Sequence, residues 1–514
     1  MLTVKSAIAA NRFGLGARPG DAERIGSDPK GWLEAQLDSA ARSAPTLPDP
    51  PESARVLGET RNLQAVRQAA AARARASASG AADEAPEPAK PQAGAKPQPH
   101  QKPQPDAKPQ PGAAAELRAF VRDHYMAQTG DRYRRAVETD APFVERLVHF
   151  WSNHFAISAD KKLLGAIAGL YEEEAIRPHV TGRFLDMLMG VEQHPAMLLY
   201  LDNAISMGPS SAAARLAARR GRDLGLNENL GREIMELHTL GVDGGYDQKD
   251  VTEFAKVLTG WSIGAYGPNA RRPGARGGGT FGAARDANDA SGDPGEFDFR
   301  PAMHEPGDKS VLGKRYREDG VHEGEAVLET LAMHPATARH LATKLARHFV
   351  ADDPPAALVD RLSDAYLRHG GELVPVYRAL LDANESWDAP LAKYKTPEDF
   401  VISAYRALGG HAPNKPQQIT AFLAELGQRP FTPGSPAGWP DTAASWDGSD
   451  ALLKRIEWGA AAGRVVADRV DPAALADAVL GAVASKQTMA SIRGAESASQ
   501  GLAILLAAPE FQRR

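Results

Sequence analysis

Residues 225–240 read GLNENLGREIMELHTL, and this stretch determines the fold class that we expect. At about 100° per residue, its large apolar side chains fall on one side of a helix over 226–240: Leu226, Leu230, Ile234, Leu237 and Leu240. Helical periodicity of the same kind dominates from residue 116 to about residue 408. We therefore predict a mainly α protein built as one large multi-helix domain.

One carboxylate falls on the apolar side of this helix. Glu233 lies inside the stripe, and Asn229 and Glu236 lie along its edge. Three neighbours point away from it: Glu228, Arg232 and Met235. A buried carboxylate is costly unless it is paired, neutralised or bound to a cation. We therefore expect Glu233 in a buried polar network or in a functional site, and the sequence leaves both open.

A second helix, predicted over 142–155 (PFVERLVHFWSNHF), repeats this pattern. His154 lies in the middle of its apolar stripe and Asn153 lies at the flank, whereas Glu145 and His149 are predicted to face solvent on the opposite side. His154 and Glu233 together suit metal binding or acid–base chemistry. A structural pair that only orients the two helices is the alternative.

A charged loop supplies further candidates. His304-Glu305-Pro306-Gly307-Asp308-Lys309 joins two stretches predicted as short paired strands, 297–300 and 310–312. Its imidazole and carboxylates suit a hard divalent metal, and a charged turn is the alternative. Asp202, after an apolar helix, is a weaker candidate that would also fit a helix C-cap.

Composition excludes several classes of function. The chain has 514 residues, no cysteine and a formal net charge of -5. The lack of cysteine removes thiolate nucleophiles, zinc–thiolate sites and cysteine-ligated iron–sulfur clusters. The charge gives no basic field for a nucleic-acid partner.

The chain also carries no sequence signal for a membrane or for export. No run approaches the about 20 apolar residues of a membrane span. The apolar stretch at residues 7–10 is too short for a signal peptide. We expect a cytoplasmic protein by default, with co-export to the periplasm beside a partner as the alternative.

Changes in composition divide the chain into segments. Residues 1–68 are predicted as the N-terminal helical part of the core, and the Ala-, Pro-, Lys- and Gln-rich residues 69–115 as a disordered insertion. The main core follows at 116–411, with a loose Gly-, Ala- and Arg-rich insertion at 266–296. A Pro-, Gly- and Trp-rich loop at 412–450 and C-terminal helices at 451–514 complete the prediction.

Several segments in a fixed order carry a family resemblance: NRFGLGARPGD, FWSNHFAIS, HPAMLLYLDNAIS, GLNENLGREIMELHTLGVDGGYDQKDVTEFAKVLTGW, MHEPGDKSVLGKRY, HPATARHLATKLARHFVADDPP, YKTPEDFVISAYRAL and PFTPGSPAGW. Together they resemble the bacterial domain of unknown function 1800 family, from about Ala10 to Phe511. The resemblance implies a helical protein of a family without an established activity. It also implies a partner, because members are often encoded beside exported, sulfatase-like proteins.

The family motifs contain many of the polar candidates: Asn153, His154, Asn229, Arg232, Glu233, Glu236, His238, His304 and Lys309. Ser152 departs from the pattern, since relatives often carry a polar aromatic residue or histidine there. This departure weakens a two-histidine interpretation of FWSNHF.

We first predict a metal-dependent enzyme, most simply a hydrolase that uses Lewis-acid activation of water. The predicted catalytic residues are Glu233, His154 and Lys309, and the predicted ligands of a divalent metal are His154, Glu233, Glu236, His304 and Asp308. The other polar candidates are Asn153, Asp202, Asn229, Arg232 and His238.

Two other classes of function remain open at this point. The first is a non-catalytic accessory or escort protein for an exported partner, which would present a large exposed apolar surface. The second is a carbohydrate- or polymer-binding protein, in which Trp439 and Trp446 would supply an aromatic platform.

Overall fold

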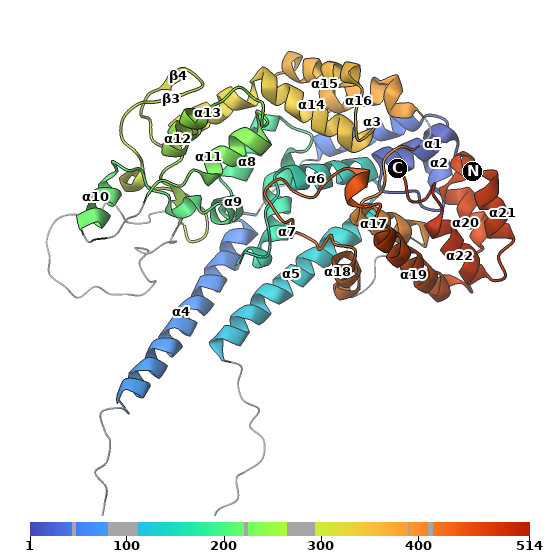
Figure 1. Ribbon diagram of the computed structural model, residues 1–514, viewed down its shortest axis with the longest axis horizontal. Helices are drawn as coiled ribbons and strands as arrows, with labels where there is room; N and C mark the ends of the chain where they lie inside the picture. The colour runs from blue at the N-terminus through green and yellow to red at the C-terminus, as the bar shows by residue number, and fades with distance from the viewer. Residues whose placement is uncertain are drawn as a thin grey trace, which may run out of the picture.

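The computed structural model describes residues 1–43, 48–80, 112–161, 163–219, 221, 225–264, 293–388, 391–409 and 415–514. Within them the chain is mainly helical, as predicted, and its strands form two small antiparallel sheets (Figure 1). Most helices pack into one body, and α4 (Glu52–Gly80) and α5 (Ala113–Glu138) extend from it side by side.

The N-terminal part begins with α1 (Val4–Ile8), η1 (Ala9–Phe13), α2 (Asp21–Ile25) and α3 (Pro29–Arg42). Helix α4 then continues beyond the predicted boundary at residue 68 as far as Gly80. The alanines and arginines of this stretch favour a helix even without an apolar face. Residues 81–111 and 265–292, which hold most of both predicted insertions, lie outside the described residues.

The central helices follow in chain order: α6 (Pro142–His154), η2 (Leu164–Ala166), α7 (Ala168–Tyr171), η3 (Glu172–Ile176), η4 (Arg177–His179), α8 (Phe184–Glu192), α9 (Pro195–Tyr200), η5 (Asn203–Ile205), α10 (Ala212–Arg219), α11 (Asn229–Glu233), η6 (Ile234–His238) and α12 (Gln248–Val257). Helix α6 begins at Pro142, as predicted from its fixed φ in a first turn. Helix α12 begins with a capping box between Asp247 and Asp250.

The second half of the chain contains η7 (Pro301–Met303), α13 (Val321–Ala332), α14 (Pro335–Phe349), α15 (Ala356–Arg368), α16 (Leu373–Asp382), η8 (Asn384–Trp387), α17 (Pro397–Ala407), α18 (Pro416–Glu425), η9 (Ala443–Ser445), α19 (Ser449–Val466), α20 (Pro472–Val479), η10 (Gly481–Val483), α21 (Lys486–Arg493) and α22 (Ala498–Ala507). Helix α18 lies inside the predicted loop 412–450, and the helical spacing of Ile419, Phe422 and Leu423 explains it. None of the helices in the described residues is long and apolar enough to cross a membrane.

The two predicted strands exist, but they do not pair with each other. Strand β2 (Phe297–Phe299) pairs with β1 (Trp261–Ile263), and β3 (Lys309–Val311) pairs with β4 (Lys314–Tyr316). The turn between β3 and β4 consists of Leu312 and Gly313, both with positive φ. Such a two-residue turn favours a local hairpin over pairing with a distant strand.

The helix predicted over 226–240 is shorter and changes its winding. It begins at Asn229, becomes a π-helix at Ile234 and ends at His238. A π-turn adds a residue to the turn and rotates the residues after it, so α-helical phasing fails there. Met235 is therefore buried rather than exposed, and Glu233 is only half-buried.

Two clusters of buried apolar side chains fill the body. The first involves α6, α8, α9 and α12–α16, and the second joins α1 to α17, α18, α20 and α22. Arg406 of α17 is fully buried and connects distant segments, because its guanidinium donates to the carbonyls of Gly16, Ala136 and Val137. The candidate site lies where the two clusters meet.

Candidate functional site

A cavity of about 300 Å³ opens between the two apolar clusters. Its walls come from α5, α6, α14, the start of α17 and the segment 428–442. Many charged side chains line it: Arg132, Arg146, Lys344, Arg347, Arg429, Glu398, Asp399 and Asp441. Apolar cavities with a few converging polar groups are common ligand sites, and this one is unusually rich in charge.

Asn153 holds the segment 428–442 against α6. Its Nδ2 donates to the carbonyl of Trp439 at 2.9 Å, and its Oδ1 accepts from the Trp439 N–H at 2.7 Å. Gly438 adopts a φ of +81°, and a Cβ there would lie 2.3 Å from the Asn153 carbonyl oxygen. The predicted polar candidate Asn153 therefore positions one wall of the cavity.

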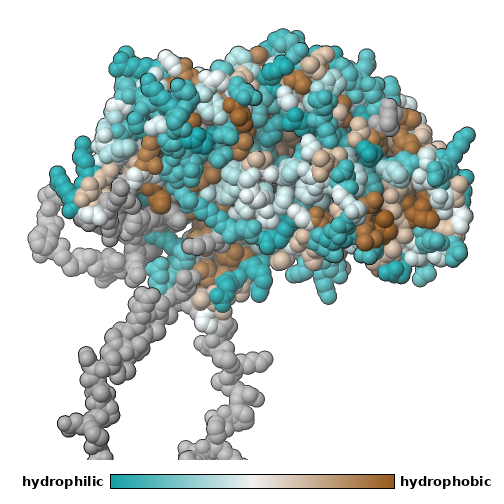
Figure 2. All heavy atoms as spheres, viewed as in Figure 1, coloured by the Kyte–Doolittle hydropathy of each residue, from teal (hydrophilic) through white to brown (hydrophobic). Residues whose placement is uncertain are grey.

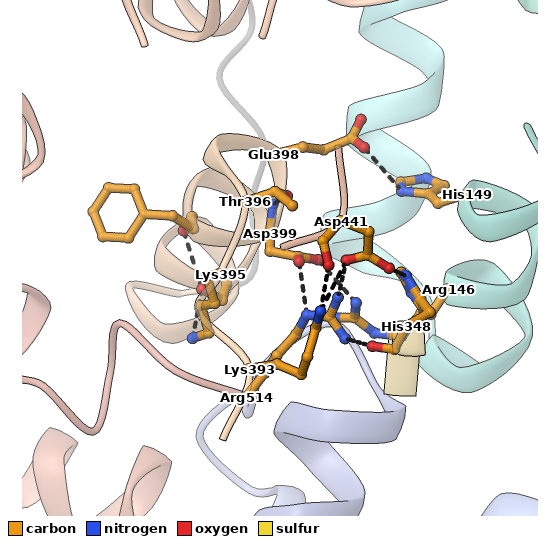
Figure 3. Close-up of polar contacts among 12 residues, drawn as sticks. Arg146, His149, His348, Lys393, Lys395, Thr396, Glu398, Asp399, Asp441 and Arg514 are labelled. Atoms are coloured by element: carbon orange, nitrogen blue, oxygen red, sulfur yellow. Dashed lines mark hydrogen bonds and ion pairs between the residues drawn. The ribbon is translucent and has the colours of Figure 1, made fainter. Parts of the chain in front are cut away.

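His348 and Asp441 form an oriented pair in this cavity (Figure 3). The His348 Nδ1–H donates to Oδ2 of Asp441 at 2.7 Å. Burial lowers the pKa of His348 to about 4, so the ring is neutral at pH 7 and Nε2 carries a lone pair. This Nε2 is buried and has no hydrogen-bond partner among the described residues. A carboxylate that fixes one imidazole nitrogen and leaves the other free is the arrangement of a general base.

Cations around Asp441 keep it ionised. Arg514 donates to Asp441 Oδ1 at 3.2 Å, and Lys393 lies 3.5 Å from the same oxygen. Burial opposes ionisation, but His348, Arg514 and Lys393 outweigh it and lower the pKa of Asp441. Arg514 also donates to the His348 carbonyl at 2.6 Å, so it fixes both members of the pair.

The start of α17 brings two more carboxylates to the cavity. Thr396 caps the helix and Asp399 lies in its first turn, where the helix dipole favours negative charge. Asp399 accepts from Arg146 at 2.9 Å and from Arg514 at 2.8 Å. These cations outweigh burial and lower the pKa of Asp399.

Glu398 faces the opposite side of the same turn. Tyr133 donates to its Oε1 at 2.8 Å, and Arg132 and His149 lie within ion-pair distance. His149 and Glu145 were predicted to face solvent, and that prediction is wrong because α6 is enclosed on both sides. Arg177 donates to both oxygens of Glu145, at 2.7 and 2.9 Å.

His154 is buried, as predicted from its place in the apolar stripe, and it lines the cavity. Its Nε2–H donates to the His238 carbonyl at 3.1 Å, which leaves the lone pair on Nδ1. Burial lowers the pKa of His154 well below its usual value. Nδ1 has no hydrogen-bond partner in the part of the chain that the structure describes.

The predicted pairing of the 154 and 233 helices is present, but it does not involve Glu233. His154 contacts the backbone of His238. Nδ1 of His238 lies 2.7 Å from Oε1 of the buried Glu192, within hydrogen-bond distance. Burial raises the pKa of Glu233, whose carboxyl is half-buried. Glu236 is half-buried in the same helix.

The loop candidates belong to a separate cluster behind the β3–β4 hairpin. Lys309 Nζ donates to Glu323 Oε2 at 2.9 Å, to the His304 ring at 3.1 Å and to the Glu305 carbonyl at 2.6 Å. Asp308 instead lies at the surface and pairs with Arg315 at 2.7 Å. None of these residues lines the cavity.

The predicted metal ligands are therefore distributed over separate places. Within the described residues, no group of three or more His, Asp and Glu side chains is arranged to hold a metal ion. Three further candidates are near or at the surface: Asp202 pairs with Lys161 at 2.6 Å, Arg232 pairs with Glu228 at 3.0 Å, and Asn229 is exposed.

Sequence reasoning did not select His348, Lys344 or Asp441. A signal for the first two exists, because His340, Lys344 and His348 recur every four residues and share one face of α14. His334 caps α14 by accepting from the Ala336 N–H. Asp441 lies in an irregular segment, where no periodicity predicts its direction.

The comparison with protein-family models agrees with the motif resemblance. No curated protein and no solved structure matches the chain. A family model, in contrast, matches residues 8–513. The chain therefore belongs to the family described as Protein of unknown function (DUF1800).

Proposed function

We propose that the cavity is the active site of a hydrolase in which His348 acts as the general base. The observation that carries the proposal is the His348–Asp441 pair, with the free Nε2 lone pair in a cavity large enough for a small substrate group. The proposed reaction is hydrolysis, as predicted from the sequence, but the His348–Asp441 pair takes the place of Glu233 and a metal ion.

The proposed reaction follows from the proton positions. His348 Nε2 takes a proton from a water molecule as that water attacks the electrophilic centre of the substrate. Asp441 stabilises the imidazolium that forms, and it stays ionised because Arg514 and Lys393 surround it. His348 then returns the proton to the leaving group.

Hydrolysis of chromogenic esters tests the proposal. The full chain is assayed with p-nitrophenyl acetate, p-nitrophenyl phosphate and bis-p-nitrophenyl phosphate, beside His348→Ala and Asp441→Asn. The matched control is His369→Ala, because His369 is exposed and lies outside the cavity. We expect turnover of at least one ester, a loss of about 10²–10⁴-fold in both site variants and no change in the control. Equal rates in wild type and His348→Ala on all three esters would overturn the proposal.

The accessory role draws support from a different surface. Leu452, Leu453 and Ile456 of α19 are exposed, and hydrophobic residues gather over the C-terminal helices at the lower right of Figure 2. A contiguous apolar patch of this kind suits contact with another protein. Under this alternative, Leu453→Asp would release the sulfatase-like protein implied by the resemblance in a pull-down, and His348→Ala would not.

A polymer-binding role has one residue in its favour. Trp439 lines the cavity, where an indole ring can pack against a sugar. Trp446 is 7% exposed, so the predicted platform of two tryptophans is reduced to one ring. Under this alternative, Trp439→Ala would abolish oligosaccharide binding, and His348→Ala would not.

A further inference from the structure

Lys344 is a cation without a counter-ion in the wall of the cavity. It is partly buried and forms no hydrogen bond or ion pair with any residue that the structure describes. Asp441 is the carboxylate that most raises the pKa of Lys344, but its oxygens already interact with His348, Arg514 and Lys393. Burial lowers the pKa of Lys344 to about 8, so its ammonium group is largely charged at neutral pH.

Arg347 adds a second cation to the same wall. It lies three residues after Lys344 on α14, so the two side chains leave the same face of the helix. Its Nε donates to the Asp352 carbonyl at 3.1 Å, and it forms no ion pair with a described carboxylate. Two neighbouring cations are costly in a cavity unless an anion neutralises them.

Helix α6 adds a hydrogen-bond acceptor to the lining of the same cavity. His154 Nδ1 carries a buried lone pair without a partner in the described chain, and Lys344 is the charged group that most affects this ring. A ligand that satisfies all three side chains has a negative oxygen for Lys344 and Arg347 and an O–H donor for His154. Hydrogen phosphate and 2-hydroxycarboxylates share this chemistry, whereas sulfate and acetate lack the donor.

We infer that Lys344, Arg347 and His154 form a subsite for a protonated or hydroxylated oxyanion, which is the anionic group of the substrate. This inference rests on the cavity being the active site proposed above. The subsite binds the non-reacting end of the substrate, and His348, one turn after Lys344 on α14, faces the bond to be broken. A negative charge on the substrate therefore becomes a requirement for productive binding.

Calorimetric titration of the full chain at pH 7 tests the subsite without any turnover. Inorganic phosphate is compared with sulfate, and lactate with acetate. We expect phosphate or lactate to bind at least tenfold more tightly than its partner anion. Lys344→Gln weakens this binding at least tenfold, and Lys344→Arg retains most of it. The matched control is Arg339→Gln, on an exposed face of the same helix in an ion pair with Asp360.

His154→Phe separates the acceptor from the cations. We expect this variant to bind phosphate and sulfate equally, because only the O–H donor is no longer recognised. Wild type that binds none of the four anions, or Lys344→Gln that binds them as wild type does, would overturn the inference. The two proposals fail differently: Lys344-dependent binding without ester hydrolysis refutes the hydrolase, whereas hydrolysis of the anionic phosphate esters that is indifferent to Lys344→Gln refutes the subsite.

Discussion

Among the residues that the structure describes, two buried clusters combine a histidine, a lysine and a carboxylate, and they differ in how completely their polar atoms find hydrogen-bond partners. Behind the β3–β4 hairpin, Lys309 donates to His304, to Glu323 and to a backbone carbonyl. In the cavity, Lys344 has no counter-ion, and His348 and His154 each present an unpartnered nitrogen among the described residues.

The difference shows that buried charge alone does not identify a site. The hairpin cluster uses its lysine to neutralise its own carboxylate, although Oε1 of Glu323 lacks a partner in the described chain. The cavity cluster leaves donors and acceptors free and surrounds them with space. Polar groups without internal partners, next to a cavity, are the combination that points to a ligand.

The largest effect is expected on catalysis, when Asp441 is replaced. Asp441→Asn keeps the shape of the pair but removes the charge that stabilises the imidazolium. We expect a loss of about 10²–10⁴-fold in kcat for ester hydrolysis. His304→Ala, at the corresponding place in the hairpin cluster, is expected to leave kcat within about twofold, since its ring lies outside the cavity. Similar losses in both variants would remove the distinction between the clusters.

The free energy of unfolding should depend more on the hairpin cluster than on the cavity. Lys309→Met leaves Glu323 as an uncompensated buried carboxylate, and breaking such a pair costs about 3–5 kcal/mol. Chemical denaturation followed by circular dichroism measures this difference. Unchanged stability would mean that the hairpin cluster is not held by its ion pair.

Lys344→Met should instead stabilise the folded chain. The pKa of Lys344 falls from 10.5 to about 8 on folding, so the charged form costs about 3 kcal/mol in the folded state. Below pH 8 this cost is present in full, and it disappears as the pH rises through 10.5. The same denaturation experiment at pH 7 should give a higher midpoint for Lys344→Met than for wild type. A lower midpoint would contradict the inference that Lys344 lacks a counter-ion.

A more gradual effect is expected from pH. Burial lowers the pKa of His340 and of His348 from 6.5 to about 4. As the pH falls below about 6.5, the unfolded chain takes up protons that the folded chain cannot accept, so the free energy of unfolding falls until about pH 4. Urea denaturation at pH 7 and pH 5 should show this loss, and His348→Gln should reduce it. A pH-independent midpoint would show that these rings are not buried in neutral form.

Most of the helical framework could be predicted from the sequence. The α6 start at Pro142, the α12 capping box and the entry of α14 at His334 depend on local chemistry that the sequence displays directly. His154 could also be found, because a polar residue in an apolar stripe is a local anomaly.

The His348–Asp441 pair could not be predicted from the sequence in the same way. The π-turn at Ile234 changes the phase of its helix, and this made Glu233 look more buried than it is. Helix α6 is enclosed on both sides, so Glu145 and His149 had no solvent face to occupy. Asp441 reaches His348 through an irregular segment 93 residues later in the chain, and only tertiary packing sets that contact.

Arg406 has a consequence for the order of folding. It lies 390 residues after Gly16, whose carbonyl it contacts, and it also contacts the end of α5. Its guanidinium obtains partners only when these segments meet, and contacts between such distant residues form slowly because closing a long loop costs entropy. Leu15 and Tyr133, which border the cavity, belong to the same two segments. The cavity is therefore completed late, and refolding chains should regain their helical signal before they regain ligand binding.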